Sequence, residues 1–269
     1  MAERPIFIPA ANDEYLVEEI FLPMQWHSGF ASVQKEKNVR ELHAAAKAAG
    51  FTPLLEVSTK SERTAGRHLS AFHLKVNTDE HGFLPLECVF QGSKVFENGG
   101  PYTDLYLKDA REAKRDTRLK ESGKLIAFRF QGHSFPLEPK TLFYDWLYIG
   151  AIFEHREWLS RLETYAAFTD IEFNPQKSVN CQARSIALFM TLMKRKLLEE
   201  AVRSPESFLS LLLRHHYCPK LGEDCCAQHS LFQRHAAPQE PSVPSEARPE
   251  PYAPSDHLNR QQSHYTSNT

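Results

Sequence analysis

The stretch LECVFQGSKVF, residues 86–96, contains a glutamate, a glutamine and a lysine whose spacing could support catalysis. On a helix each residue turns by about 100°, so Gln91 would lie about 40° and Lys94 about 20° from Glu87. A carboxylate beside a partly desolvated lysine combines a general acid or base with an amine nucleophile, because burial lowers the pKa of a lysine. An ordinary glutamate–lysine pair on a solvated helix face has the same spacing, and geometry alone does not separate the two interpretations.

A second group of candidates is cationic and suits a nucleic-acid partner. Four basic residues follow one another at i, i+3, i+4 and i+7, which predicts one cationic stripe along a helix that could bind phosphates. Near the start of the chain, Trp26 precedes several cations and could stack on a base. A solvated charged face and a core tryptophan are the alternative interpretations. The stripe consists of Arg111, Lys114, Arg115 and Arg118.

A third candidate is the segment of residues 215–229, which gathers histidines with Cys218, Cys225 and Cys226. Structural zinc sites usually need paired thiols separated by two or more residues, whereas Cys225 and Cys226 are adjacent, so we predict no metal site. The chain also lacks a GxGxxG motif after a strand, a P-loop motif and a GxSxG motif. Dinucleotide oxidoreductases, P-loop enzymes and serine hydrolases are therefore disfavoured, and we expect no cofactor.

The composition is that of a globular protein without a bias towards a charged partner. The 269 residues are 41% hydrophobic, and 32 basic against 34 acidic residues give a net charge of −2. The sequence has no apolar run of about 18 residues and no charged-then-apolar leader, so we expect neither a membrane segment nor secretion. An odd number of cysteines, five, favours reduced thiols and a cytoplasmic location.

Hydrophobic patterning predicts an α+β fold that is mostly helical, with a small sheet of short strands. Residues 1–230 are expected to form one domain, and residues 235–269, with six prolines among polar residues, a disordered tail. The expected helices are residues 32–49, 85–96, 110–121, 139–162, 180–203 and 204–216, and the expected strands are 54–57, 71–76 and 125–130.

The order of motifs around the opening stretch resembles the NADAR family, which is named for its links to NAD and ADP-ribose metabolism. EVSTKS (56–61) is followed by LSAF (69–72), a strand, and a helix with Glu87, Gln91 and Lys94. Over about residues 4–195, the chain is more closely similar to the NADAR branch encoded beside DarT-class toxins, which attach ADP-ribose to guanosine in DNA. The motifs that carry this resemblance are WHSGFASVQKEKN, LEVSTKS, LSAFHL, FQGSKVFENGGPYTDLY, AKRDTRLKESG, EPKTLFYDWLY and FTDIEFNPQKSVNCQA.

The resemblance implies a NADAR-like domain that removes ADP-ribose from guanine in DNA, as the antitoxin of a toxin–antitoxin system. In this interpretation, Lys94 replaces the guanine amine through a Schiff base and Glu87 shuttles protons. The implied partners are ADP-ribosylated DNA, ADP-ribose and the cognate DarT-class toxin. The alternatives are an N-glycosidase of small phosphorylated ribosylamino metabolites and a non-catalytic immunity protein that binds ADP-ribose or the toxin.

Further polar residues within these motifs are candidates for substrate binding. Gln91 would orient Glu87 or hold a ribose hydroxyl, and Lys60 would bind phosphate. The cationic stripe and Trp26 would surround the pocket and bind DNA, because a base must leave the duplex for such chemistry. Turn-forming or capping roles are the alternative for the polar residues. The candidates for contacts with ribose, phosphate or adenosine are Ser58, Ser70, Asp170, Asn174 and Asn180.

Overall fold

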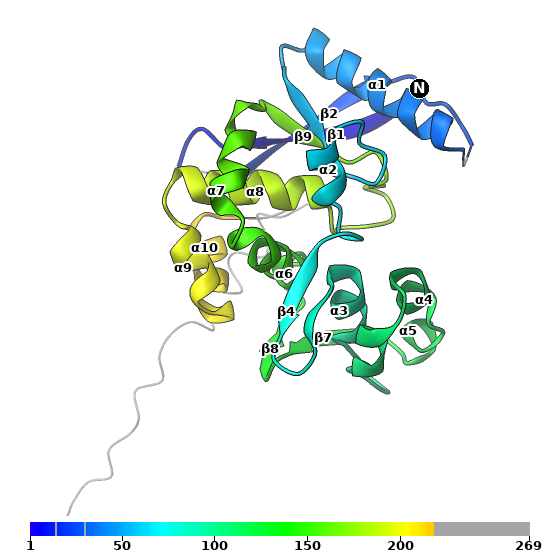
Figure 1. Cartoon of the computed structure of the whole chain (residues 1–269), viewed down its shortest axis with the longest axis vertical. Coiled ribbons are helices and arrows are strands. Elements are labelled where there is room, and N and C mark those ends of the chain that lie inside the picture. Colours follow the sequence, from blue (N-terminus) through cyan, green and yellow to red (C-terminus); the bar gives the residue numbers. More distant parts are fainter. Residues whose placement is uncertain (14, 30, 218–269) are drawn as a thin grey trace, which may run out of the picture. The chain divides into compact units, whose positions relative to one another are not determined.

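The computed structural model describes residues 1–13, 15–29 and 31–217, in which short β-strands pack between helices (Figure 1). Within this part of the chain, the mixture of helices and short strands confirms the predicted α+β fold. No helix among these residues is long and apolar enough to cross a membrane. The predicted tail, residues 235–269, and the cysteines Cys218, Cys225 and Cys226 lie outside the described residues.

A four-stranded sheet of order β2-β1-β9-β3 lies between α1 (Ser32–Ala48) and α8 (Gln182–Lys194) (Figure 1). β1 pairs antiparallel with β2 and β9, and β9 pairs parallel with β3. Because successive side chains of a strand point to opposite faces, Ile6 packs in one cluster with α1 and Phe7 in another with α8. The strands are β1 (Ala2–Pro9), β2 (Val17–Met24), β3 (Leu54–Glu56) and β9 (Ala167–Thr169).

In the sequence, one small sheet precedes α3 (Leu86–Gly92) and another follows it. The β4–β5 hairpin precedes this helix, and an antiparallel sheet of order β6-β7-β8 follows it. The Phe90 ring of α3 lies 5.3 Å from that of Phe128 on β7 and 6.0 Å from that of Phe143 on α6 (Leu142–Phe153). Aromatic packing therefore fixes α3 against the core. The strands are β4 (Lys75–Thr78), β5 (Gly82–Pro85), β6 (Lys94–Phe96), β7 (Leu125–Phe130) and β8 (His133–Phe135).

Short helices connect these layers, and α6 packs against α8 and α9 in the largest hydrophobic cluster. The predicted helices at 32–49 and 204–216 and the predicted strands at 54–57 and 125–130 are confirmed by α1, α10, β3 and β7. Ser204 caps α10 by accepting a hydrogen bond from the Ser207 N–H at 3.1 Å. The short helices are α2 (Thr64–His68), η1 (Thr103–Leu107), α4 (Ala110–Arg115), α5 (Arg118–Glu121), α7 (Arg156–Leu159), η2 (Ser160–Thr164), α9 (Leu198–Arg203) and α10 (Pro205–Arg214).

Three predicted long helices are each interrupted, so their predicted lengths are wrong. The 110–121 helix breaks where the Asp116 carboxylate accepts a hydrogen bond from the Arg118 N–H at 3.1 Å, which competes with the helical pattern. The predicted helix 139–162 is divided, because α6 ends at Phe153 and two separate short helices, α7 and η2, follow it. The 180–203 helix breaks at Lys196, whose φ of 58° is left-handed.

Two further predictions are wrong around the opening stretch. The predicted helix 85–96 ends at Gly92, because the following residues pair as β6 with β7. The predicted strand 71–76 begins only at Lys75, because the Ser70 carbonyl accepts hydrogen bonds from the N–H groups of His73 and Leu74 and closes a turn. Strands β1, β2, β5, β6, β8 and β9 were not predicted at all.

A buried carboxylate joins β3 to β9 and to the loop that follows β9. Glu56 accepts hydrogen bonds from the hydroxyls of Ser58 and Thr169, both at 2.6 Å, and from the Ile171 N–H at 2.9 Å. Burial raises the pKa of Glu56 to about 7, although these three donors favour its charged form. This cluster fixes the start of the loop at residues 170–180.

The raised pKa of Glu56 predicts a loss of stability as the pH rises. An unfolded glutamate ionises near pH 4.5, so the stability associated with Glu56 is present below that pH and lost as the pH passes about 7. We expect the free energy of unfolding of the wild type to fall between pH 5 and 8, relative to Glu56→Gln, by on the order of 3 kcal/mol. Urea unfolding at both pH values measures this difference, and parallel pH dependence of the two proteins would contradict it.

Candidate active site

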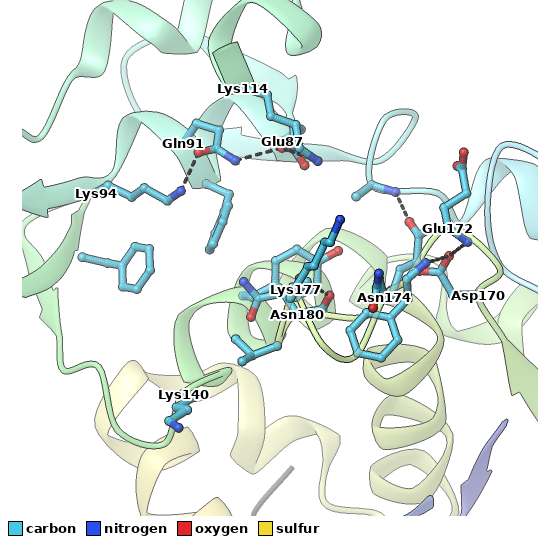
Figure 2. Close-up of a pocket in the computed structure, with 18 of the residues that line it drawn as sticks. Glu87, Gln91, Lys94, Lys114, Lys140, Asp170, Glu172, Asn174, Lys177 and Asn180 are labelled. Carbon is cyan, nitrogen blue, oxygen red and sulfur yellow. Dashed lines mark hydrogen bonds and ion pairs between the residues drawn. The ribbon is translucent and has the colours of Figure 1, made fainter. Parts of the chain in front are cut away.

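A cavity of about 720 Å³ brings together α3, the start of β6, the segment before α6 and the loop after β9 (Figure 2). Its volume lies within the range of about 300–1,000 Å³ that is usual for small-molecule sites. The polar or charged residues that line it and bear on its chemistry are Glu87, Gln91, Lys94, Lys114, Glu138, Lys140, Tyr144, Asp170, Glu172, Asn174, Lys177, Asn180 and Gln182.

One wall carries the three residues of the opening stretch, joined as a hydrogen-bonded chain (Figure 2). The Lys94 Nζ donates to Gln91 Oε1 at 2.6 Å, and the Gln91 Nε2 donates to Glu87 Oε1 at 2.9 Å. The three residues are therefore neighbours, as predicted, but not on one helix face, since Lys94 is the first residue of β6. Gln91 separates the amine from the carboxylate and orients both.

α3 ends at Gly92, where the backbone packs closely against η1. A β-carbon at Gly92 would lie 2.6 Å from the Tyr106 ring, closer than real contacts allow. The next residue, Ser93, shares a hydrogen bond of 2.8 Å with the Tyr106 hydroxyl. Its carbonyl accepts a further hydrogen bond from the Arg129 N–H of β7, also at 2.8 Å. The chain thereby turns from helix to strand immediately before Lys94.

Lys94 lies in surroundings that favour its uncharged form. Burial lowers the pKa of its amine to about 8, the charge of Glu87 opposes this shift, and the charge of Lys114 adds to it. The Phe90 ring, whose centre lies 5.0 Å from the Nζ, favours the charged form and so opposes the effect of burial. At pH 7, about a tenth of the Lys94 amines are therefore uncharged, a far larger fraction than for a free lysine. An amine in this state can act as a nucleophile.

Lys114 belongs to the cavity rather than to an outer stripe. Its Nζ lies 3.5 Å from Glu87 Oε1 and 5.6 Å from the centre of the Phe72 ring, and both of these residues line the cavity. Glu87 is buried, and its Oε1 contacts both the Gln91 amide and the Lys114 amine. The sequence pattern identified Lys114 as cationic but not this contact with Glu87.

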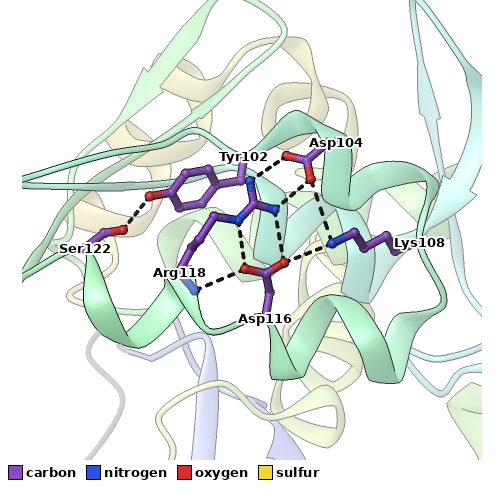
Figure 3. Close-up of polar contacts among 6 residues, drawn as sticks. All are labelled: Tyr102, Asp104, Lys108, Asp116, Arg118 and Ser122. Atoms are coloured by element: carbon purple, nitrogen blue, oxygen red, sulfur yellow. Dashed lines mark hydrogen bonds and ion pairs between the residues drawn. The ribbon is translucent and has the colours of Figure 1, made fainter.

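The predicted single cationic stripe is wrong, because α4 and α5 are separate helices. Arg118 turns away to pair with Asp104 at 2.7 Å and Asp116 at 2.8 Å, and its guanidinium lies 4.4 Å from the centre of the Tyr102 ring (Figure 3). Hydrogen bonds from Arg118 hold the pKa of Asp116 well below its ordinary value. Arg111, Arg115 and Arg118 do not line the cavity.

The loop after β9 forms the opposite wall and includes three predicted binding residues, Asp170, Asn174 and Asn180. Asp170 accepts hydrogen bonds from the N–H groups of Glu172 and Phe173, and burial raises its pKa well above the ordinary value. The Asn180 Oδ1 is buried and has no hydrogen-bond partner among the described residues, which leaves an acceptor beside the cavity.

Four other predicted site residues do not line the cavity. Ser58 and Ser70 are fully buried, and the Ser58 hydroxyl donates to Glu56 instead. Lys60 lies outside the lining as well. Trp26 packs in the cluster of α1, with the Arg4 guanidinium 4.4 Å from the centre of its ring.

Several cavity residues have no strong signal of their own in the sequence and were not predicted. Tyr144 lies within an aromatic helix and resembles a core residue. Lys177 and Gln182 both fall within the motif FTDIEFNPQKSVNCQA, and only that motif could have identified them. Gln182 accepts a hydrogen bond from the Ala71 N–H at 2.8 Å, which ties α8 to the turn containing Phe72. Among the described residues, no group of three His, Cys, Asp or Glu side chains could hold a metal ion.

Comparison with known proteins gives one family match. The family described as the DarT1-associated NADAR antitoxin matches residues 2–220 of this chain, a longer range than that of the motifs quoted above. A search of curated proteins finds no match.

The contact between Lys114 and Glu87 leads to a prediction for Lys94. In Lys114→Ala, the pKa of Lys94 should rise above about 8, because one of the charges that lower it is removed. A rise of half a pKa unit would reduce the uncharged fraction at pH 7 about threefold. The rate of amine modification of Lys94 against pH, followed by mass spectrometry, measures this. Lys140→Ala removes another cavity lysine and serves as the matched control. An equal response of Lys94 in both variants would contradict the prediction.

Proposed function

The chain belongs to the family of DarT1-associated NADAR antitoxins, and we propose that it neutralises the toxin by hydrolysing ADP-ribose from guanine in DNA. The observation that carries this proposal is the chain of hydrogen bonds from Lys94 through Gln91 to the buried Glu87 in the wall of a large cavity. This arrangement places an amine with a lowered pKa and a carboxyl group on either side of one amide side chain, that of Gln91.

The proposed reaction suits a bond between the exocyclic amine of guanine and ribose C1″. This aminal opens when the ring C–O bond breaks and the nitrogen lone pair forms an iminium. The Lys94 amine adds to C1″, the guanine amine leaves with a proton, and a lysine Schiff base remains. Water then adds to the imine, so that ADP-ribose is released and the Lys94 amine is restored. Glu87 carries the protons between these groups.

The opposite wall of the cavity has the side chains to hold the rest of the substrate. Lys177 and Lys140 supply positive charge for the diphosphate, and both line the cavity with Asn174. The unpartnered Oδ1 of Asn180 would accept a hydrogen bond from a ribose hydroxyl or an adenine amine, which removes the cost of an unsatisfied buried acceptor. Ser58 and Ser70 would act indirectly, by holding the loops rather than by touching the substrate.

Hydrolysis of an ADP-ribosylated oligonucleotide tests the proposal directly. The wild type should release ADP-ribose, and Glu87→Gln and Lys94→Arg should each lower kcat by at least about 100-fold, because each removes a group that reacts or transfers a proton. Lys120→Ala, on α5 outside the cavity, should match the wild type. Turnover of small ribosylamino nucleotides but not of DNA would favour the metabolite N-glycosidase. Toxin neutralisation that survives Glu87→Gln would favour a non-catalytic immunity protein.

Trapping of the imine tests the role of Lys94 separately. Borohydride added during turnover should reduce the Schiff base and attach the ADP-ribose moiety to Lys94. Because only the uncharged amine adds to C1″, the trapped fraction should rise as the pH passes about 8. Peptide mapping by mass spectrometry locates the adduct, and Lys94→Arg is the control without a reactive amine. An adduct on another residue would exclude Lys94 as the nucleophile.

A further inference from the structure

A second cavity, of about 460 Å³, shares a wall with the candidate active site. The common wall is the turn of residues 69–74. Ala71 and Phe72 line the first cavity, whereas Leu69, His73 and Leu74 line the second. Residues 69–74 can span at most about 18 Å even when extended, so the linings of the two cavities come within that distance of each other at this turn.

The shared turn is held rigidly, so the two cavities keep a fixed separation. The Tyr148 hydroxyl donates to the Leu69 carbonyl at 2.7 Å, and Gln182 accepts from the Ala71 N–H at 2.8 Å. Within the turn, the Ser70 carbonyl accepts hydrogen bonds at 2.8 and 2.9 Å. A ligand that enters both cavities therefore meets a preformed partition rather than a mobile loop.

The second cavity combines exposed aromatic rings with neutral and basic polar groups. Phe83 on β5 is 60% exposed and Trp158 on α7 is 42% exposed, although large aromatic side chains are usually buried. Both line this cavity, as do three histidines, Lys75 and Asn77, and the one carboxylate in its lining is Glu154. Exposed aromatic rings beside hydrogen-bonding groups form a stacking platform for planar heterocycles. The three histidines are His68, His73 and His155.

We propose that the second cavity binds an unpaired base of the DNA strand, close to the modified guanosine whose ADP-ribose occupies the first cavity. This inference rests on the proposed function and extends it to a second site. Trp158 and Phe83 would stack on the base, and His73 and Asn77 would reach its polar edge. A purely apolar ligand would leave these polar groups unused, and a free phosphate would leave the aromatic rings unused.

Where the first cavity adjoins the shared turn, its lining suits the sugar–phosphate backbone of a strand that enters both cavities. Phe72 is 38% exposed on the shared turn, and the Lys114 Nζ lies 5.6 Å from the centre of its ring. Lys114 thus supplies a cation where the strand would cross from one cavity to the other. With a net charge of −2, the protein must gain most of its affinity from stacking, so binding should depend only weakly on salt.

Binding of an unmodified single-stranded oligonucleotide tests the second cavity without requiring hydrolysis. Fluorescence anisotropy should show that Trp158→Ala and Phe83→Ala each weaken binding by at least about fivefold, since stacking on an aromatic side chain is worth about 1–3 kcal/mol per base. Leu107→Ala, which removes an exposed hydrophobic side chain outside both cavities, should bind as the wild type does. Thermal unfolding checks that each variant is folded. Unchanged binding by both folded aromatic variants would overturn the proposal.

Kinetics with two substrates separates this inference from the proposed function. Trp158→Ala should raise KM for an ADP-ribosylated oligonucleotide at least about fivefold, and leave KM and kcat for an ADP-ribosylated guanosine mononucleotide unchanged. If the wild type hydrolyses neither substrate, the proposed function fails, while weakened oligonucleotide binding by the variant still supports the second cavity. If the variant loses binding to the toxin but keeps wild-type oligonucleotide binding, the cavity is a protein contact and the inference is wrong.

Discussion

The geometry of the candidate site depends on two buried ionisable groups, Glu56 and Arg184, that fix the loop after β9. At its start, Glu56 at the end of β3 accepts three hydrogen bonds, from the hydroxyls of Ser58 and Thr169 and from the Ile171 N–H. At its end, Arg184 donates to the Val179 carbonyl at 2.7 Å and pairs with Glu19 of β2 at 2.9 Å, with both side chains buried. Buried polar and charged groups are costly when they lose their hydrogen-bond partners, so these contacts allow few alternative loop positions. The loop therefore presents its polar residues to the cavity in one arrangement.

The wall formed by α3 depends on the aromatic core instead. Phe90 packs against Phe128, Phe143 and Tyr144, so the helix cannot rotate without opening the largest cluster. This packing also excludes water from one side of Lys94, which explains why burial is the largest cause of its lowered pKa. The reactivity assigned to the amine is thus a consequence of the core and not of a neighbouring charge alone.

The sequence predicted the contact among Glu87, Gln91 and Lys94 but not the geometry that produces it. Helical spacing placed all three on one face, whereas β6 pairs with β7 and the long Lys94 side chain reaches back to Gln91. Strand pairing is a non-local interaction that the periodicity of one segment does not contain. The motifs likewise led to Asn174 and Asn180 in the cavity, yet could not distinguish them from Ser58, which is buried and does not line it.

Lysines converge on the cavity from four separate segments: Lys94, Lys114, Lys140 and Lys177. Because the chain as a whole carries a charge of −2, its long-range attraction to a DNA backbone is weak. Within the cavity, by contrast, the four lysines face three glutamates, Glu87, Glu138 and Glu172, and burial raises the pKa of Asp170, which favours its uncharged form. An anionic diphosphate would therefore be attracted to the cavity and not to the surface in general. Under the proposed function, this would select DNA that carries ADP-ribose over the large excess of unmodified DNA, since the modification itself supplies the charge that the cavity binds.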